Sequence, residues 1–100
     1  MKLYKVKLLT VVCEILAQKN VLGILERHDI RGYTTYEVHG KGARGIRGQG
    51  LQNEKNAKIE VIVREEKLSG VIEEISQTMF ADYALVLYVS DVGVVRTEKF

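Results

Sequence analysis

The sequence predicts an α+β protein with a ferredoxin-like sandwich, in which two helices cover one face of a four-stranded antiparallel sheet. The chain has 100 residues, which is enough for one core of two packed layers. Four segments have the pattern of strands and two have the pattern of helices. Their order along the chain is βαββαβ, which is the order of this fold. We therefore expect residues 1–100 to form a single domain.

The strands are expected at residues 4–13, 32–39, 58–63 and 84–89. In the first, polar and apolar residues alternate up to Leu8, and residues 8–12 (L-L-T-V-V) then form an almost continuous apolar run. A run of this kind is typical of a strand in the middle of a sheet. In the third, Ile59, Val61 and Val63 share one face.

The helices are expected at residues 14–29 and 67–80. The second has the clearer pattern, because its apolar residues recur at helical spacing: Leu68, Val71, Ile72, Ile75 and Met79. The first has a similar cluster but also contains Gly23, which costs about 1 kcal/mol of helix propensity. Asp29 and Gly32 mark its end.

Two helices cannot cover both faces of such a sheet. The first and last strands nevertheless have apolar residues on both sides. An uncovered apolar face is the mark of an interaction surface, and closed symmetric assemblies are the usual way to cover one. We therefore expect an oligomer.

The composition argues against several classes of protein. No apolar run approaches the roughly 18 residues of a membrane span, and residues 1–7 do not resemble a secretory leader, so we expect a cytoplasmic protein. The single cysteine, Cys13, ends an apolar run and is expected to be buried. The sequence has no metal-ligand spacing and no catalytic set, so we predict neither a metal site nor an enzyme.

A long loop is expected between the second and third strands, at residues 40–56. Its first part, residues 40–50, is the candidate binding loop, and we call it the Gly/Arg loop. It contains five of the nine glycines, three cations (Lys41, Arg44 and Arg47) and no acid. Glycines allow backbone N–H groups to converge on an anion, and arginine forks fit phosphate oxygens. The loop therefore predicts phosphate binding.

Two familiar phosphate motifs do not explain this loop. Residues 40–45 match G-x-G-x-x-G, but residues 46–50 (I-R-G-Q-G) cannot begin the helix that a dinucleotide fold requires. A P-loop is excluded as well, because no Gly-Lys-Ser/Thr follows at the right spacing.

At G-Y-T (32–34) and G-K-G-A-R-G-I-R (40–47) the chain resembles PII-like signalling proteins, in particular SbtB and carboxysome-associated PII-like proteins. K-I-E-V (58–61) and F-A-D-Y (80–83) extend the resemblance over nearly the whole chain. The resemblance implies a homotrimer whose intersubunit clefts bind AMP, cyclic AMP (cAMP), ADP or ATP. It also implies a regulatory partner, either a membrane bicarbonate transporter or another protein of inorganic-carbon metabolism. With such a transporter, the trimer would be recruited to the inner face of the plasma membrane.

The resemblance also assigns roles to residues. The phosphate would be held in the Gly/Arg loop by Lys41, Gly42, Ala43, Arg44, Ile46 and Arg47. The base and ribose would lie against Gly32, Tyr33, Thr34 and Val38 of one strand and Leu87, Tyr88, Val89 and Ser90 of the last strand. Glu60 would be a further contact, which a neighbouring subunit could supply.

The chain departs from the PII pattern after its second helix. Many PII proteins have a second phosphate-binding segment there, of the type T-G-x-x-G-D-G-K. Residues 78–84 read T-M-F-A-D-Y-A, with neither glycine nor lysine. We therefore expect AMP, cAMP or ADP to be favoured over ATP. The sequence has no tyrosine between residues 40 and 56, so uridylylation at that position is not expected.

Two other interpretations stay open at this point. A ferredoxin-like sheet with aromatic residues and an arginine-glycine loop is also typical of single-stranded nucleic-acid-binding modules. The net charge of only +2 and the acids Glu37 and Glu60 argue against that class. An acylphosphatase-like enzyme ranks last, because it needs an arginine-containing loop after the first strand, and residues 11–14 (V-V-C-E) offer none.

Overall fold

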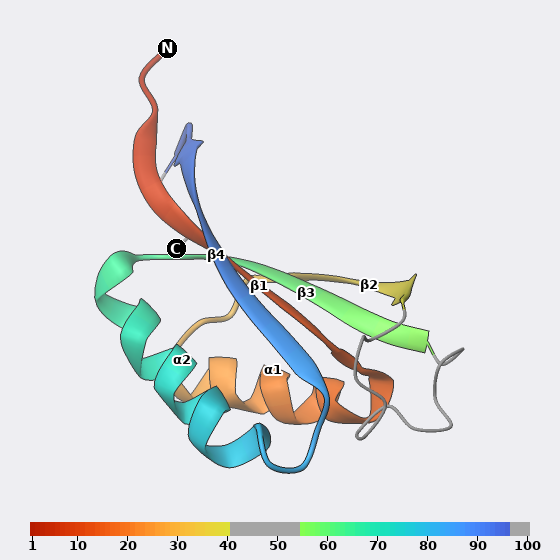
Figure 1. Cartoon of the computed structure of the whole chain (residues 1–100). Coiled ribbons are helices and arrows are strands. Elements are labelled where there is room, and N and C mark those ends of the chain that lie inside the picture. The colour runs from red at the N-terminus through yellow and green to blue at the C-terminus, as the bar shows by residue number, and fades with distance from the viewer. Residues whose placement is uncertain (41–54, 97–100) are drawn as a thin grey trace.

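The computed structural model describes residues 1–40 and 55–96, and it confirms the expected βαββαβ order. The elements are the strands β1 (Tyr4–Glu14), β2 (Thr34–His39), β3 (Lys55–Val63) and β4 (Leu85–Val94), the helices α1 (Gln18–Arg27) and α2 (Glu65–Met79), and a short 3₁₀ turn, η1 (Ile15–Ala17). Both helices lie on one side of the sheet (Figure 1). No helix in the described ranges is long and apolar enough to cross a membrane.

The four strands form one antiparallel sheet in the order β2-β3-β1-β4. β1 and β3 therefore occupy the centre, and β2 and β4 form the two edges. The expected central place of the first strand is confirmed. β1 pairs with β4 from Tyr4 opposite Val94 to Cys13 opposite Leu85, and with β3 from Lys7 opposite Val63 to Glu14 opposite Asn56.

The core lies between the sheet and the two helices. Alternate residues of β1 and β3 point into it, because successive side chains of a strand face opposite sides. In α2, Val71, Ile75 and Met79 recur every four residues and close the core from the helical side. The fully buried core side chains from the sheet are Leu9, Val11, Cys13, Ala57, Ile59, Val61 and Val63.

The first helical segment is shorter than the expected range of 14–29. The chain leaves β1 through η1 and becomes α-helical only at Gln18. The helix ends at Arg27 with His28 as its C-cap, and Asp29 then adopts a left-handed backbone (φ 62°). The Ile30 N–H closes this turn by donating to the Leu25 carbonyl at 2.9 Å. For a residue other than glycine, such a backbone costs of order 1 kcal/mol or more.

Two strands are longer than their patterns predict. β4 continues to Val94, five residues past the expected end at residue 89, because the first half of β1 offers it a partner as far as Tyr4. β3 begins at Lys55 rather than at residue 58, because Asn56 pairs with both Val38 and Glu14. The paired ends of β1 and β4 project together beyond the rest of the molecule (Figure 1).

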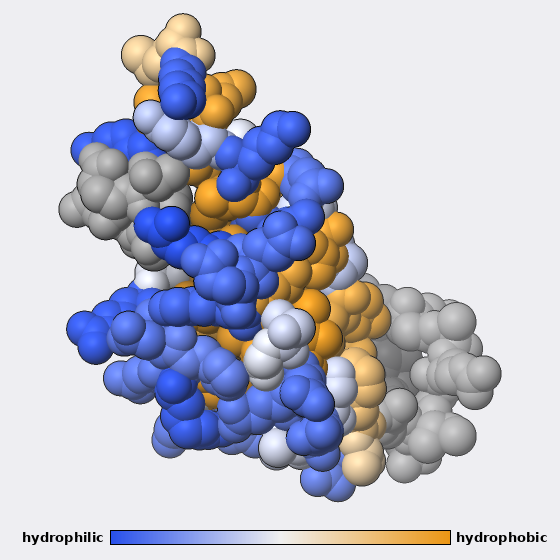
Figure 2. Space-filling model, turned by 90° about the vertical axis from the view of Figure 1, so that its left-hand side faces the viewer, coloured by the Kyte–Doolittle hydropathy of each residue, from blue (hydrophilic) through white to orange (hydrophobic). Residues whose placement is uncertain are grey.

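The face of the sheet opposite the helices, which we call the open face, is rich in apolar side chains. Val12 and Val86 face each other there, and Val86 is 58% exposed. Tyr36 and Tyr88 are also exposed on this face. Figure 2 views the molecule from the left-hand side of Figure 1, and from there a band of hydrophobic residues runs from the top toward the lower right of the view, between hydrophilic residues. The expectation that one face is left uncovered by the helices is confirmed, and its role as a subunit interface stays a prediction.

Candidate functional site

The register of the sheet brings three of the predicted ligand residues into one row on the open face. Thr34 on β2 lies opposite Glu60 on β3, Glu60 lies opposite Thr10 on β1, and Thr10 lies opposite Tyr88 on β4. Directly opposed residues of antiparallel strands share a face. Thr34, Glu60, Thr10 and Tyr88 therefore form a cross-strand row that runs from one edge of the sheet to the other.

The middle of the open face is polar. The Tyr36 hydroxyl donates to a Glu60 carboxylate oxygen (Oε2) at 3.0 Å. The Lys58 ammonium lies 5.7 Å from the centre of the Tyr36 ring, within the range of a cation–π contact. The neighbouring Tyr36 hydroxyl, and to a smaller extent that of Tyr88, raises the pKa of Lys58 above its ordinary value. Lys58 is therefore a cation at neutral pH, on the same face of β3 as Glu60.

Lys58 and Thr10 were not among the residues that the sequence singled out. Thr10 is only 1% exposed although it lies on the open face. One signal for Lys58 was available: it is two residues from Glu60 in an alternating strand, so both must share a face. Thr10 could not be found in this way, because its place between Glu60 and Tyr88 depends on the pairing register.

The other predicted base- and ribose-contacting residues are more scattered. Val38 and Ser90 also lie on the open face, but in other rows of paired residues than Thr34 and Tyr88. Val38 lies opposite Asn56, and Ser90 lies opposite Leu8. Leu87 and Val89 point to the helical side, opposite Val11 and Leu9, and Leu87 packs against the core. The Leu87 side chain is therefore turned away from a ligand on the open face, whereas Val89 is 40% exposed on the helical side. Gly32 and Tyr33 are exposed and precede β2.

The predicted phosphate-binding residues (Lys41, Gly42, Ala43, Arg44, Ile46 and Arg47) lie outside the described residues. The topology still fixes where their segment is attached. It connects the end of β2 to the start of β3, with His39 paired to Lys55. β1 ends and β4 begins at the same end of the sheet, so the turn between α2 and β4 belongs to this end as well.

The turn between α2 and β4 is held by contacts within the chain. A Glu14 carboxylate oxygen (Oε2) accepts a hydrogen bond from the backbone N–H of Ala84 at 2.9 Å. The Asn20 amide donates to the Tyr83 hydroxyl at 3.2 Å. A carboxylate thus occupies a backbone donor in the segment where the sequence lacks the second phosphate-binding motif. Within the described ranges, no group of three or more His, Cys, Asp or Glu residues is placed to hold a metal ion.

Comparison with known proteins decides the family. Residues 6–99 match the model of the family described as nitrogen regulatory protein P-II. The chain belongs to the P-II family. This confirms the resemblance to PII-like proteins, whereas the narrower resemblance to SbtB proteins stays a prediction. Membership in a family of regulatory proteins does not favour the nucleic-acid-binding and acylphosphatase-like alternatives.

Solved structures of P-II relatives have the same fold over 95% or more of the chain. A PII-like signaling protein of Thermus thermophilus is 36% identical, with a TM-score of 0.82, and the match covers 100% of this chain and 99% of that one. CPII of Thiomonas intermedia, bound to ADP, AMP and acetate, is 26% identical (TM-score 0.84; 100% and 98% covered). In another structure CPII is bound to ADP and bicarbonate (29% identical; TM-score 0.80; 95% and 93% covered).

Proposed function

We propose that this P-II family protein is a homotrimeric sensor of adenine nucleotides, which it binds in clefts between its subunits. The observation that carries the proposal is that two features belong to the same sheet. The Gly/Arg loop, with three cations and no acid, begins where β2 ends. The Thr34–Glu60–Thr10–Tyr88 row runs across the same sheet. ADP and AMP bound to CPII support the choice of ligand.

The expected affinity follows from the charges of the loop. A hydrogen bond to a charged group contributes about 1.5–3 kcal/mol. Arg44, Arg47 and Lys41 would together supply much of the roughly 8 kcal/mol that micromolar binding needs. The second phosphate-binding motif is missing, and Glu14 occupies the Ala84 N–H. We therefore expect AMP, cAMP or ADP to bind more tightly than ATP.

The open face supplies the surface for assembly. Its apolar residues on β1 and β4 would be covered by the neighbouring subunits of the trimer. The nucleotide would then lie where the β2 edge of one subunit meets the β4 edge of the next. Occupancy of the cleft would select the conformation of the Gly/Arg loop that docks on a partner.

The partner that we propose is a membrane transporter for bicarbonate, or another protein of inorganic-carbon metabolism. The chain's resemblance to SbtB proteins motivates this choice. The bicarbonate bound to CPII, a relative with the same fold, fits a link to carbon metabolism. Copurification of the tagged trimer with membranes, in the presence and absence of AMP, tests the recruitment. A trimer found only in the soluble fraction under both conditions would contradict it.

Isothermal titration with AMP, cAMP, ADP and ATP tests nucleotide sensing. We expect micromolar binding of at least one of the first three and weaker binding of ATP. The double variant Arg44→Ala/Arg47→Ala should lose binding and remain trimeric. A matched control, Lys2→Ala/Lys19→Ala, removes the same charge elsewhere and should bind as the parent does. The absence of any binding tighter than millimolar would refute the proposal.

A further inference from the structure

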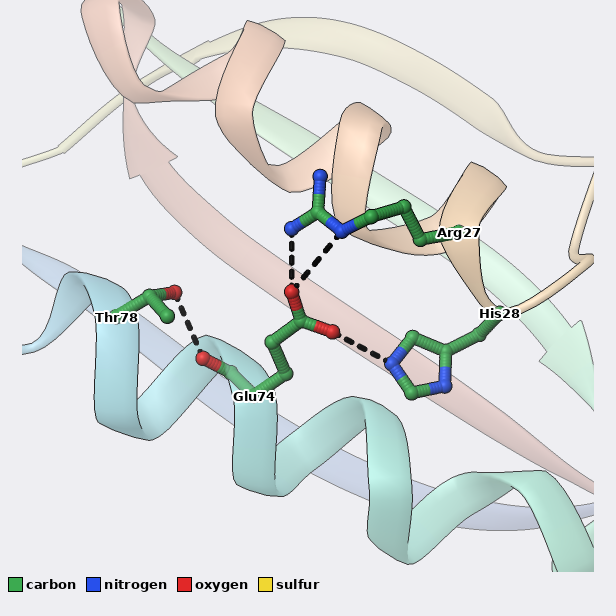
Figure 3. Close-up of polar contacts among 4 residues, drawn as sticks. All are labelled: Arg27, His28, Glu74 and Thr78. Carbon is green, nitrogen blue, oxygen red and sulfur yellow. Dashed lines mark hydrogen bonds and ion pairs between the residues drawn. The ribbon is translucent and has the colours of Figure 1, made fainter.

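The two helices are joined by one polar cluster on their outer side (Figure 3). The Glu74 carboxylate of α2 uses both oxygens. Its Oε2 accepts hydrogen bonds from the Nε (3.1 Å) and Nη2 of Arg27, the last residue of α1. Its Oε1 lies 2.7 Å from Nε2 of His28, the residue that caps that helix. The Arg27 hydrogen bond, and then that of His28, lowers the pKa of Glu74, so its carboxylate is charged at neutral pH.

Gly70 gives the His28 ring its place against α2. A Cβ atom at position 70 would lie 3.3 Å from Cε1 and 3.6 Å from Nδ1 of that ring. The close approach accounts for a glycine in the middle of α2, where it lowers helix propensity. Two separate features of α2, the Glu74 carboxylate and the missing side chain at Gly70, are therefore fitted to His28.

The same helix also holds the turn that follows. The Lys67 ammonium donates to the Asp29 carbonyl at 3.1 Å. Asp29 has the left-handed backbone described above, and Ile30 is anchored in the core. The next three residues, 31–33, are exposed, and β2 then begins at Thr34. α2 therefore holds the chain at residues 28 and 29, shortly before the exposed residues that lead into β2.

We propose that Glu74 is a positioning residue, which fixes the start of β2 for ligand binding by clasping Arg27 and His28. The inference rests on the proposed function, because it takes Gly32, Tyr33 and Thr34 to be part of the nucleotide site. Glu74 itself lies on the outer side of the helices and touches none of these residues. Its effect passes through the 28–30 turn.

The variant Glu74→Gln tests the contacts of Glu74 with Arg27 and His28, because it keeps the size of the side chain and removes its charge. The matched control is Glu73→Gln. Glu73 is the preceding residue of the same helix and is exposed, and its side chain has no hydrogen bond or ion pair to any described residue. Amide ¹H–¹⁵N spectra of the full-length protein without nucleotide report the position of residues 32–34 directly. Titrations with AMP and ADP then report the effect on affinity.

We expect Glu74→Gln to shift or broaden the amide signals of residues 32–34 and to weaken AMP and ADP binding by about two- to thirtyfold. Glu73→Gln should do neither. The inference is overturned if Glu74→Gln alters only the signals around residues 27, 28 and 74, or if both variants disturb residues 32–34 alike. If Glu74→Gln fails to fold, Gly70→Ala, which crowds the His28 ring, takes its place with the same expected signature. Failure of the proposed function would look different, since the unaltered protein would then bind no nucleotide.

Discussion

Thr34 and Tyr88 face the same side of the sheet in one cross-strand row, yet they lie on its two opposite edges. Three strand spacings separate them, which is about 14 Å. In the proposed cleft, the β2 edge of one subunit approaches the β4 edge of the next, which brings a Thr34 and a Tyr88 to the same nucleotide. In the proposed function, ligand binding and assembly therefore depend on each other.

Val86→Lys should dissociate the trimer. Val86 is more than half exposed on the open face, and a lysine there would place a charge in the proposed interface. Sedimentation velocity should show monomers, while far-UV circular dichroism stays unchanged. The control is Leu16→Lys in η1, where the parent side chain is 82% exposed and lies outside the sheet. A Val86→Lys protein that sediments like the parent would show that the open face is not the interface.

Cys13 should be nearly inert toward thiol reagents while the protein is folded. Burial raises its pKa to about 11, with a smaller contribution from Glu14. At pH 8 the reactive thiolate would then be only about a thousandth of the thiol. Titration with Ellman's reagent should be at least about 100-fold slower in buffer than in urea. Equal rates in the two solvents would mean that Cys13 is open to solvent.

The stability that Glu74 supplies should depend on pH. Hydrogen bonds from Arg27, and then His28, hold its pKa below the ordinary value of 4.5. The unfolded chain therefore binds a proton at the Glu74 carboxyl more tightly than the folded chain does. The contribution is complete above pH 4.5 and is lost as the pH falls further. The difference in urea midpoint between the parent and Glu74→Gln should shrink under acid, and a difference that is constant down to unfolding would contradict this.

Gly23→Ala and Gly70→Ala should differ although both replace a helical glycine. At Gly23 the nearest atom to an added Cβ is the flexible Arg27 Nη1 at 3.8 Å. This change should raise the free energy of unfolding by about 0.5–1 kcal/mol. At Gly70 the added Cβ meets the His28 ring, which must move. We therefore expect Gly70→Ala to raise the free energy of unfolding less than Gly23→Ala does, or to lower it, as measured by urea denaturation. Equal increases in the two variants would contradict this.

The sequence predicts the element order and the core well, because alternation in the strands and helical spacing in α2 are local patterns. The last residues of β4 were missed for the opposite reason. Ser90, Asp91 and Gly93 look unlike a strand, and they are held there by pairing with β1, which no local pattern reveals. The start of β3 was missed for the same reason, since Asn56 becomes a strand residue through its pairing partners.

The candidate site also contains some residues that the sequence indicates and others that only the pairing of the strands reveals. Thr34, Glu60 and Tyr88 were selected by resemblance, and the register places them in one row. Thr10 completes the row and could be found only from the pairing of β1 with both neighbours. Leu87 and Val89 were grouped with Tyr88 as neighbours in sequence, but alternation turns them to the helical side. The roles of all these residues in binding stay predictions.

Mixed trimers test most directly whether a nucleotide binds between two subunits. One subunit type carries Arg44→Ala/Arg47→Ala and the other carries Tyr88→Ala, so that each homotrimer should bind AMP and ADP poorly. When the two are co-expressed, about a quarter of the clefts should pair an intact Gly/Arg loop with an intact Tyr88 by random assortment. We predict that titration of the mixed trimers recovers sites of parental affinity in about that proportion. Mixed trimers that bind no better than the two separate variants would contradict a site shared between subunits.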